Sequence, residues 1–304
     1  MPSRLKRMRE RKLSIALATG DFHTLMHSSR LPPLPAHVIR LVGLCEDPSS
    51  DASAVAEVIS LDPGLAAWIL RLANSAAFGV AVRIANVRRA VVTLGMRRVR
   101  DYALGRAAIG NLREIESDQH DGKRFWAESL QRGILAAELA RKLVPGAEGE
   151  AFAGGLLQDM AVPALFAACP EEYGGLAAGV SGPALAVMEL EAFGWSHAQA
   201  GAWLATDWGF PNELVCAIGM HHESYEEIAK RSLLRTPVGV VSFTGGLHSP
   251  CNPETEELQA FSSQLEHWYE ITPAEADDIL VTAESCFLEA LEVFNLPRPE
   301  EMRF

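Results

Sequence analysis

Ala151-Phe-Ala-Gly-Gly-Leu-Leu-Gln-Asp-Met-Ala-Val-Pro-Ala-Leu165 is an Ala-, Gly- and Leu-rich segment that contains two adjacent polar residues, Gln158 and Asp159. Its composition predicts a buried helix that places these two polar side chains at its end. Gln158, Asp159 and Pro163 interrupt the apolar run, so it falls short of the ~18–20 residues that a membrane helix needs. The segment therefore predicts the core of a globular protein with a polar site inside it.

Outside this segment, apolar residues recur with the 3.6-residue period of a helix, as Val38, Leu41, Val42 and Cys45 do, and strand-like alternation is absent. Helix starts are marked by Pro35, by Asp51 and Asp62-Pro63, and by two further capping segments. Ser196 caps a helix over 197–207, which Gly209 ends. Thr272 and Glu275 form a capping box at the start of the last helix. We expect an all-α protein of roughly a dozen helices with no sheet.

The chain divides into three parts by composition. Residues 1–30 form a basic leader with one amphipathic helix, and residues 31–230 form the main domain, with helical lobes at 31–115 and 121–230. Residues 231–304 are an acidic helical extension that we expect to pack back on the body. The five cysteines are scattered without a C-x-x-C pair, and the N-terminus lacks a long apolar leader. These features favour a cytoplasmic protein with reduced thiols.

The net charge of −12 conceals an asymmetry between the two parts of the chain. Residues 1–113 carry 17 Lys and Arg against 8 Asp and Glu, whereas the remainder carries 10 against 31. A candidate basic surface consists of Arg88, Arg89, Arg97, Arg98 and Arg100. It could recognise an acidic partner or a phosphate, or it could pair with the acidic part of the same chain, which is the interpretation we favour. Specific nucleic-acid binding is not expected, because no helix-turn-helix or zinc motif accompanies these arginines.

Several ordered motifs resemble those of the HDOD family, helical domains related to HD phosphohydrolases and found mainly in bacterial signalling proteins. The resemblance covers about 31–225. Its motifs are Leu31-Pro-Pro-Leu-Pro35, Val58-Ile-Ser-Leu-Asp-Pro-Gly-Leu65, Arg71-Leu-Ala-Asn-Ser-Ala-Ala-Phe-Gly79, Ala90-Val-Val-Thr-Leu-Gly95, Phe125-Trp-Ala-Glu-Ser129, Gly154 to Asp159, Gly194-Trp-Ser-His-Ala-Gln-Ala-Gly201, Trp208-Gly-Phe-Pro211 and His221-His222. It implies an HD-like helical bundle with two lobes.

The same resemblance implies that the metal-binding pattern of active HD enzymes is incomplete here. Glu128 stands at the position of a ligand histidine, Gln158-Asp159 replaces the His-Asp pair, and Thr244 stands near the later aspartate. A glutamine amide is a poorer ligand for transition metals than an imidazole. We therefore expect no bound metal, no cofactor and no hydrolysis of phosphodiesters.

A degenerate cleft is expected from Glu128, Gln158, Asp159, His197, His221 and His222. Side chains adjacent on a helix diverge by ~100°, so His221 and His222 should not bind one ion together unless His197 or a carboxylate joins them. These groups could hold the helices in register through hydrogen bonds, line a pocket for a small ligand, or form a weak oxygen-rich site for Mg²⁺ or Ca²⁺.

The sequence as a whole favours a non-enzymatic signalling module that acts through contacts with a partner protein. Two alternatives stay open at this point. One is a sensor of a nucleotide second messenger, and the other is a metal-dependent phosphohydrolase.

Overall fold

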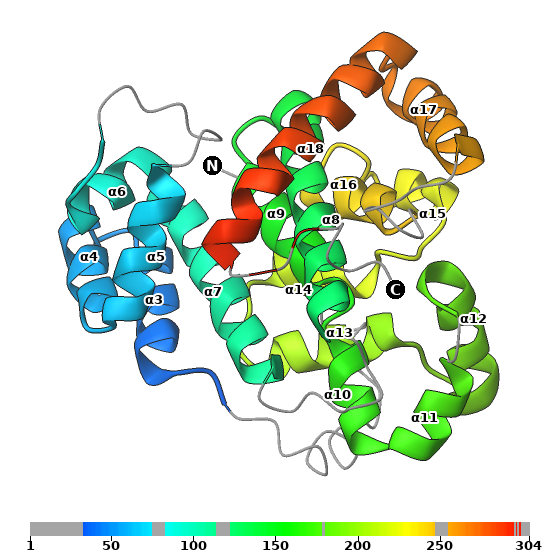
Figure 1. Ribbon diagram of the computed structural model, residues 1–304, viewed down its shortest axis with the longest axis horizontal. Coiled ribbons are helices and arrows are strands. Elements are labelled where there is room, and N and C mark those ends of the chain that lie inside the picture. Colours follow the sequence, from blue (N-terminus) through cyan, green and yellow to red (C-terminus); the bar gives the residue numbers. More distant parts are fainter. Residues whose placement is uncertain are drawn as a thin grey trace.

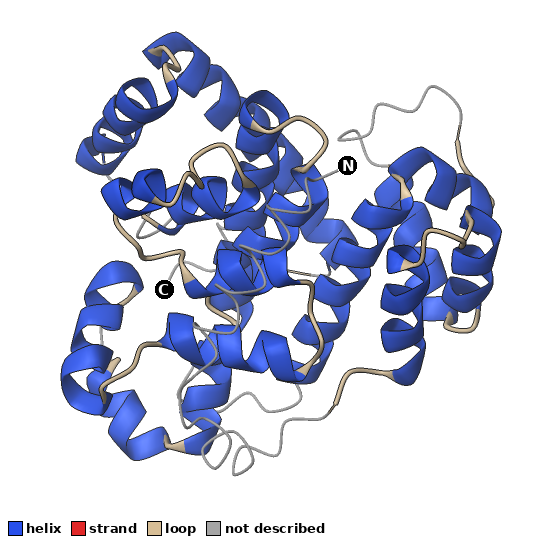
Figure 2. Ribbon diagram, turned by 180° about the vertical axis from the view of Figure 1, so that it is seen from behind, coloured by secondary structure: helices blue, strands red, loops and turns tan. Residues whose placement is uncertain are grey.

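The computed structural model describes residues 33–74, 83–113, 122–177, 180–246 and 255–294, together with Leu296 and Arg298. All regular elements in these ranges are helices, and these ranges contain no strand (Figure 2). The predicted all-α class is confirmed. The predicted leader helix at 1–30 lies outside the described residues.

The N-terminal lobe consists of four short helices whose starts follow the predicted caps. They are α3 (Ala36–Glu46), α4 (Ala52–Ser60), α5 (Pro63–Ala73) and α6 (Val87–Leu94). Asp51 accepts two hydrogen bonds from backbone N–H groups in the first turn of α4, and Asp62 accepts two from α5. Both aspartates thereby satisfy donors that the helix itself leaves without partners. Asn74 joins the end of α5 to the chain before α6 by hydrogen bonds with the backbone of Ile84.

The long helix α7 connects this lobe to the rest of the molecule (Figure 1). Helix α7 spans Met96–Arg113. The helices of the second lobe are α8 (Gly122–Leu143), α9 (Glu148–Leu157), α10 (Ala161–Ala168), α11 (Pro170–Leu176), α12 (Gly182–Phe193), α13 (His197–Asp207), α14 (Asn212–Gly219), α15 (Tyr225–Lys230) and α16 (Pro237–Gly245). Helices α8, α9, α14 and α16 pack against one another at its centre, and α10 to α13 lie at the lower right of Figure 1.

Glycine allows α8 and α9 to approach at backbone distance. A Cβ added at Gly155 would lie 2.8 Å from the carbonyl oxygen of Arg132 and 3.0 Å from the Cα of Gly133. A larger residue at Gly155 would therefore push the two helices apart. This contact places the end of α9, and with it Asp159, close to the middle of α8.

The C-terminal part departs from the predicted division of the chain. Helix α16 was assigned to the extension, but all of its residues are buried and it packs on α8, α9 and α14. The bundle therefore continues to Gly245, and only α17 (Thr255–Tyr269) and α18 (Pro273–Phe294) are appended to it. Helix α18 lies against α8 and α5, as expected for an extension packed back on the body. Its first turn has the predicted capping box, in which Glu275 accepts a hydrogen bond from the Thr272 backbone.

The stretch Glu148–Ala168 is long and apolar enough to cross a membrane by composition. In the described structure it spans α9 and α10, and 89% of its most apolar window is buried by protein. The packing of this stretch is that of a core segment, because neighbouring helices already cover its apolar surface.

Candidate functional site

Four side chains meet where three segments of the second lobe converge. Asp159, His197, His221 and His222 each present one atom, and these atoms all lie within 4.8 Å of one another. Asp159 follows the end of α9, and His197 is the first residue of α13. The first three residues are buried, whereas His222 is partly exposed. We call this group the His-Asp cluster.

The two histidines that follow α14 come together because they do not lie on a helix. Helix α14 ends at Gly219, and His221 and His222 occupy the turn after it. Their ring centroids are 3.9 Å apart. The expectation that these rings diverge on a helix was wrong, since the turn removes the helical spacing on which it rested. His197 also joins them, with its Nε2 atom 3.0 Å from the Nε2 atom of His222.

Hydrogen bonds to the Nδ1 atoms of His197 and His221 orient the two rings so that their Nε2 atoms face Asp159. The Nδ1 atom of His221 lies 2.6 Å from the carbonyl oxygen of Ile218, which can only accept, so Nδ1 carries a proton. The Nδ1 atom of His197 lies 2.7 Å from a carboxylate oxygen of Glu189. The Nε2 atoms of both rings then lie 3.2 Å from the same Asp159 oxygen, Oδ1.

Glu189 supports the cluster from α12 and was not predicted. Its side chain is fully buried, and it also accepts hydrogen bonds from the His197 backbone N–H at 2.6 Å and from the Tyr173 hydroxyl at 2.5 Å. These bonds fix the orientation of the His197 ring. A charged residue inside the apolar run of α12, shortly before a histidine, was the available signal in the sequence.

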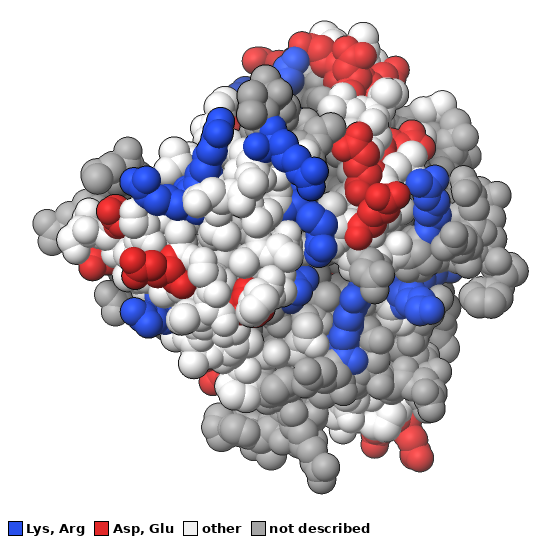
Figure 3. Space-filling model, turned by 60° about the vertical axis from the view of Figure 1, so that its left-hand side comes forward, with Lys and Arg blue, Asp and Glu red and all other residues white. Residues whose placement is uncertain are grey.

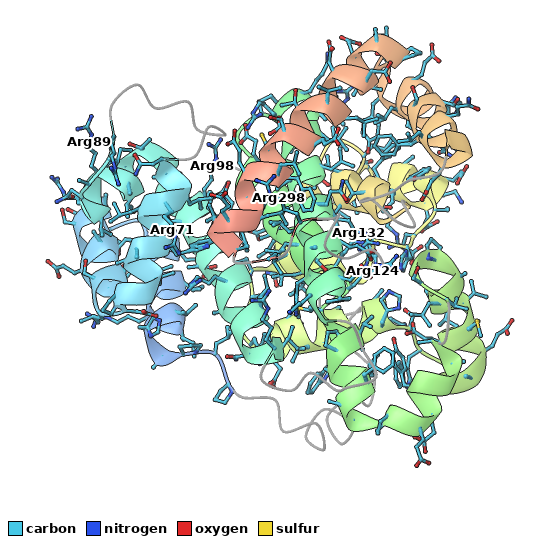
Figure 4. The ribbon with its side chains drawn as sticks, in the orientation of Figure 1. Arg71, Arg89, Arg98, Arg124, Arg132 and Arg298 are labelled. Carbon is cyan, nitrogen blue, oxygen red and sulfur yellow. The ribbon has the colours of Figure 1, made fainter. Side chains whose placement is uncertain are left out.

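Arg132 brings a positive charge to the cluster from α8 and was also missed. Its guanidinium nitrogen lies 3.4 Å from the second Asp159 oxygen, Oδ2, and its side chain lies to the right of α8 in Figure 4. The amide nitrogen of Gln158 lies 3.3 Å from the same oxygen. Burial alone would raise the pKa of Asp159, but hydrogen bonds from His197 and His221 and the charge of Arg132 lower it well below its usual value.

The pKa values of His197 and His222 are shifted in opposite directions. Burial lowers the pKa of His197, but its hydrogen bonds to Asp159 and Glu189 outweigh burial and raise it to about 9. Burial and the charges of His221 and His197 lower the pKa of His222. In the absence of an ion, the charges of Arg132 and protonated His197 therefore balance those of Asp159 and Glu189.

Two residues of the predicted site lie apart from the cluster contacts. The Glu128 carboxylate pairs with Arg124, one turn earlier on α8, at 2.9 Å. The Thr244 hydroxyl donates to the carbonyl of Val241 within α16. Helix α16 approaches the cluster instead at Gly245, where a Cβ would lie 2.6 Å from the His221 carbonyl oxygen. A carboxylate ligand is thus supplied to the cluster by α9 and not by the described part of α16.

The His-Asp cluster has the donor set of a divalent metal site. Imidazole nitrogens suit Zn²⁺, Fe²⁺ and related ions, and ligand histidines usually donate their other N–H to a carboxylate or a backbone carbonyl, as His197 and His221 do here. The buried Nδ1 atom of His222 and Oε1 atom of Gln158 lack a hydrogen-bond partner among the described residues. Asp159, His197, His221 and His222 are therefore the residues that would hold such an ion.

Three of the five arginines of the candidate basic surface form ion pairs within the molecule. Arg97 and Arg98 pair with Glu150 and Glu148 of α9, at 3.2 and 2.5 Å. Arg100 is only 3% exposed and was wrongly placed on the surface. It pairs with the buried Asp101, with the partly buried Glu213 and with Glu46, which is half-exposed. Figure 3 shows blue side chains in a band down one face with acidic groups beside them.

The remaining two arginines lie on the N-terminal lobe. Arg88 donates to the hydroxyl of Ser53 at 2.8 Å, and Arg89 lies at the outer edge of the lobe in Figure 4.

Comparison with known proteins places these features in a family. The model of the HDOD domain matches residues 31–224. A crystal structure from Shewanella amazonensis SB2B, named "Putative phosphohydrolase", is 24% identical with a TM-score of 0.69, covering 90% of this chain and 98% of that one. An HDOD domain protein of unknown function from Geobacter sulfurreducens is 20% identical with a TM-score of 0.65 and covers the same shares.

A relative from Treponema pallidum (strain Nichols), an uncharacterized protein, is 26% identical over 196 residues. This alignment takes in 63% of the present chain but only 37% of the relative. At these identities the solved structures establish the shared fold alone. The family model covers well over half of the sequence, and the chain therefore belongs to the HDOD domain family.

Proposed function

We propose that this protein is a non-catalytic regulatory module of bacterial signal transduction, working in the cytoplasm through contacts with a partner protein. The observation that carries this proposal is the internal neutralisation of Asp159. Both of its carboxylate oxygens are engaged, Oδ1 by two histidines and Oδ2 by Arg132. The acidic group on which hydrolytic chemistry would depend therefore already serves to hold α8, α9 and α13 together.

The composition of the His-Asp cluster also argues against catalysis when an ion is bound. A bound divalent ion would supply Lewis-acid and water-activating chemistry. Catalytic zinc sites usually have three protein ligands and keep an open position, whereas four protein ligands are typical of structural sites. The four side chains of the cluster are enough to complete such a closed set. Arg132 adds a fixed positive charge beside it, which disfavours a second cation.

Two relatives support a modular signalling role. A solved structure from Marinobacter aquaeolei VT8, 20% identical with a TM-score of 0.62, is named "Putative signal transduction protein", and the match covers 95% of this chain and 66% of that one. The Treponema relative is longer than the matched region.

A phosphodiesterase assay tests whether the protein is non-catalytic. Protein treated with a chelator, and protein then loaded with Mn²⁺, Fe²⁺ or Zn²⁺, should hydrolyse neither bis(p-nitrophenyl) phosphate nor a cyclic dinucleotide above the buffer rate. Elemental analysis of the same samples separates metal binding from catalysis. Turnover that is lost in Asp159→Ala but kept in Glu128→Ala, whose carboxylate pairs with Arg124, would refute a non-catalytic role.

We expect the partner protein to contact α12, because one side of this helix supports the His-Asp cluster and its other side is exposed. Glu189 faces inward to His197, while Val187 and Leu190 are 55% and 50% exposed on the other side. We expect a partner captured from the native cytoplasm to be lost by the Val187→Asp/Leu190→Asp variant. The control variant Val92→Asp alters a valine on α6 that is 64% exposed, and it should retain the partner. Equal capture by all three proteins would exclude α12 as the contact surface.

A further inference from the structure

A cavity of about 260 Å³ lies between the N-terminal lobe, the α8–α9 pair and α18, away from the His-Asp cluster. Leu72 of α5 and Tyr102 of α7 form one wall, Phe152 of α9 another, and Phe294 of α18 a third. Leu72 belongs to the apolar face predicted for α5, but it is only half-buried because it borders this cavity. Small-molecule sites are usually clefts of ~300–1,000 Å³, so the cavity suits a ligand of one or two rings.

Aromatic rings make up much of the apolar wall. Tyr102 and Phe152 meet edge to face with their centroids 5.0 Å apart, and Phe152 lies 6.2 Å from Phe294. Tyr102 and Phe152 are almost completely buried. Aromatic faces carry a negative quadrupole, so a group of rings favours a cation over an anion of the same size.

Charged residues at the wall strengthen this preference. Two arginines line the cavity, and each already has a carboxylate: Arg98 pairs with Glu148, and Arg141 pairs with Glu138. The Glu138 side chain is 7% exposed. Glu289 is a third carboxylate of the wall, and no third arginine of the wall matches it. The charged groups of the cavity wall therefore sum to one negative charge.

The thiol of Cys286 lies among these same charged groups. Burial raises its pKa, and the carboxylates of Glu138 and Glu289 raise it further, while Arg141 opposes them. Cys286 lines the cavity, so the field that it experiences acts on any ligand there.

We propose that this cavity binds a small organic cation whose aromatic or aliphatic body packs on Tyr102, Phe152 and Phe294. Its charged end lies toward Glu138 and Glu289. The regulatory consequence rests on the proposed signalling function and follows from the helices that line the cavity. Helix α8 carries Glu138 here and Arg132 at the His-Asp cluster, and α9 carries Phe152 here and leads into Asp159. A ligand that fixes these helices relative to α18 acts on both sites.

Two probes with the same ring system and opposite charge test the site. Tryptamine is a cation at neutral pH, and indole-3-acetate is an anion. Tryptamine should raise the melting temperature of the full chain saturably and bind at least ~10-fold more tightly than indole-3-acetate. Equal binding of the two probes, or failure of tryptamine to bind at millimolar concentration, would overturn the proposal.

Variants of α18 connect the binding to the cavity. Glu289→Gln should weaken tryptamine binding ~2–5-fold, since it removes the unmatched carboxylate. Glu284→Gln removes a carboxylate that is also exposed on α18 but does not line the cavity, and it should change nothing. Ala290→Phe should abolish binding by filling the cavity. An equal effect of Glu284→Gln and Glu289→Gln would show that only the general surface charge matters.

Thiol protection locates the bound probe without any substitution. Tryptamine should slow the alkylation of Cys286 by iodoacetamide at least ~5-fold, as followed by peptide mass spectrometry. Cys169, a partly buried thiol in the α10–α11 region, should react at an unchanged rate. Protection of both thiols alike would contradict binding in this cavity. These readouts do not depend on hydrolysis or on partner capture, so they can fail while the proposed function stands, and the reverse also holds.

Discussion

Replacing Trp68 by alanine should lower the free energy of unfolding by about 3–5 kcal/mol, the range for large aromatic residues in a protein core. Trp68 is completely buried in α5. Its ring meets Phe294 of α18 edge to face at 5.4 Å, and the guanidinium of Arg106 lies 5.7 Å from its centroid. The substitution would leave a cavity between the N-terminal lobe and the C-terminal helix, so it should loosen two parts of the molecule together.

Urea denaturation of Trp68→Ala and of a matched surface variant measures this effect. Leu61→Ala changes an apolar residue of the same lobe that is 66% exposed, and it should shift the unfolding free energy by less than ~0.5 kcal/mol. Comparable losses in the two variants would mean that the Trp68 site relaxes without leaving a cavity.

The second large effect concerns a buried carboxylate at the junction of four helices. Asp101 of α7 is completely buried and bonds Arg100 at 2.7 Å, while its other oxygen has no hydrogen-bond partner among the described residues. Burial is the main cause that raises its pKa to about 7, and the carboxylates of Glu150 on α9 and Glu213 on α14 add to it against the charge of Arg100. The charge of Asp101 also adds to burial, the main cause, in raising the pKa of the Cys45 thiol on α3.

This raised pKa makes an ionised Asp101 destabilising. Its pKa of about 7 in the folded protein exceeds the ordinary aspartate pKa of 3.8, so the native state binds the proton more tightly than the unfolded chain does. Its contribution to stability is therefore present below about pH 4 and is lost as the pH rises to about 7. The full loss is on the order of 4 kcal/mol, at about 1.4 kcal/mol for each pKa unit.

Asp101→Asn should remove this dependence. The variant should match the wild type near pH 4 and exceed it by up to about 4 kcal/mol at pH 8, in denaturation curves recorded at both values. Glu213→Gln removes a different partner of Arg100 and the smallest of the contributions to the raised pKa of Asp101, but it leaves the buried carboxylate in place, so most of the wild-type pH dependence should remain. A difference between wild type and Asp101→Asn that stays constant with pH would exclude Asp101 as the titrating group.

Local chemistry explains why the helices could be predicted. Asp51, Asp62 and Thr272 start their helices as expected, because a cap is formed between residues two or three positions apart. The predicted helix over 197–207 has these bounds in the structure, and Gly209 follows it with a φ of +72°. The domain boundary near residue 230 misplaced α16, since the packing of an apolar helix depends on partners that are distant in sequence.

The candidate site was likewise predicted in part. Resemblance to the family singled out Gln158, Asp159, His197, His221 and His222, and the structure brings these five residues together. It also predicted Glu128, but the residue of α8 that reaches Asp159 is Arg132, one turn later.

By itself, the sequence determined the all-helical class, most helix ends and the residue types of the site, because these follow from periodicity, capping and local composition. Only the tertiary structure decided which charges meet. Arg132 and Glu189 come from different helices, α8 and α12, and neither lies on the same helix as the residue of the cluster that it contacts. The candidate basic surface shows this most clearly: three of its five arginines pair with carboxylates that the fold brings to them, over as many as 113 residues of sequence for Arg100. Electrostatic pairing depends on distance in space, and the sequence does not contain that distance until the helices pack.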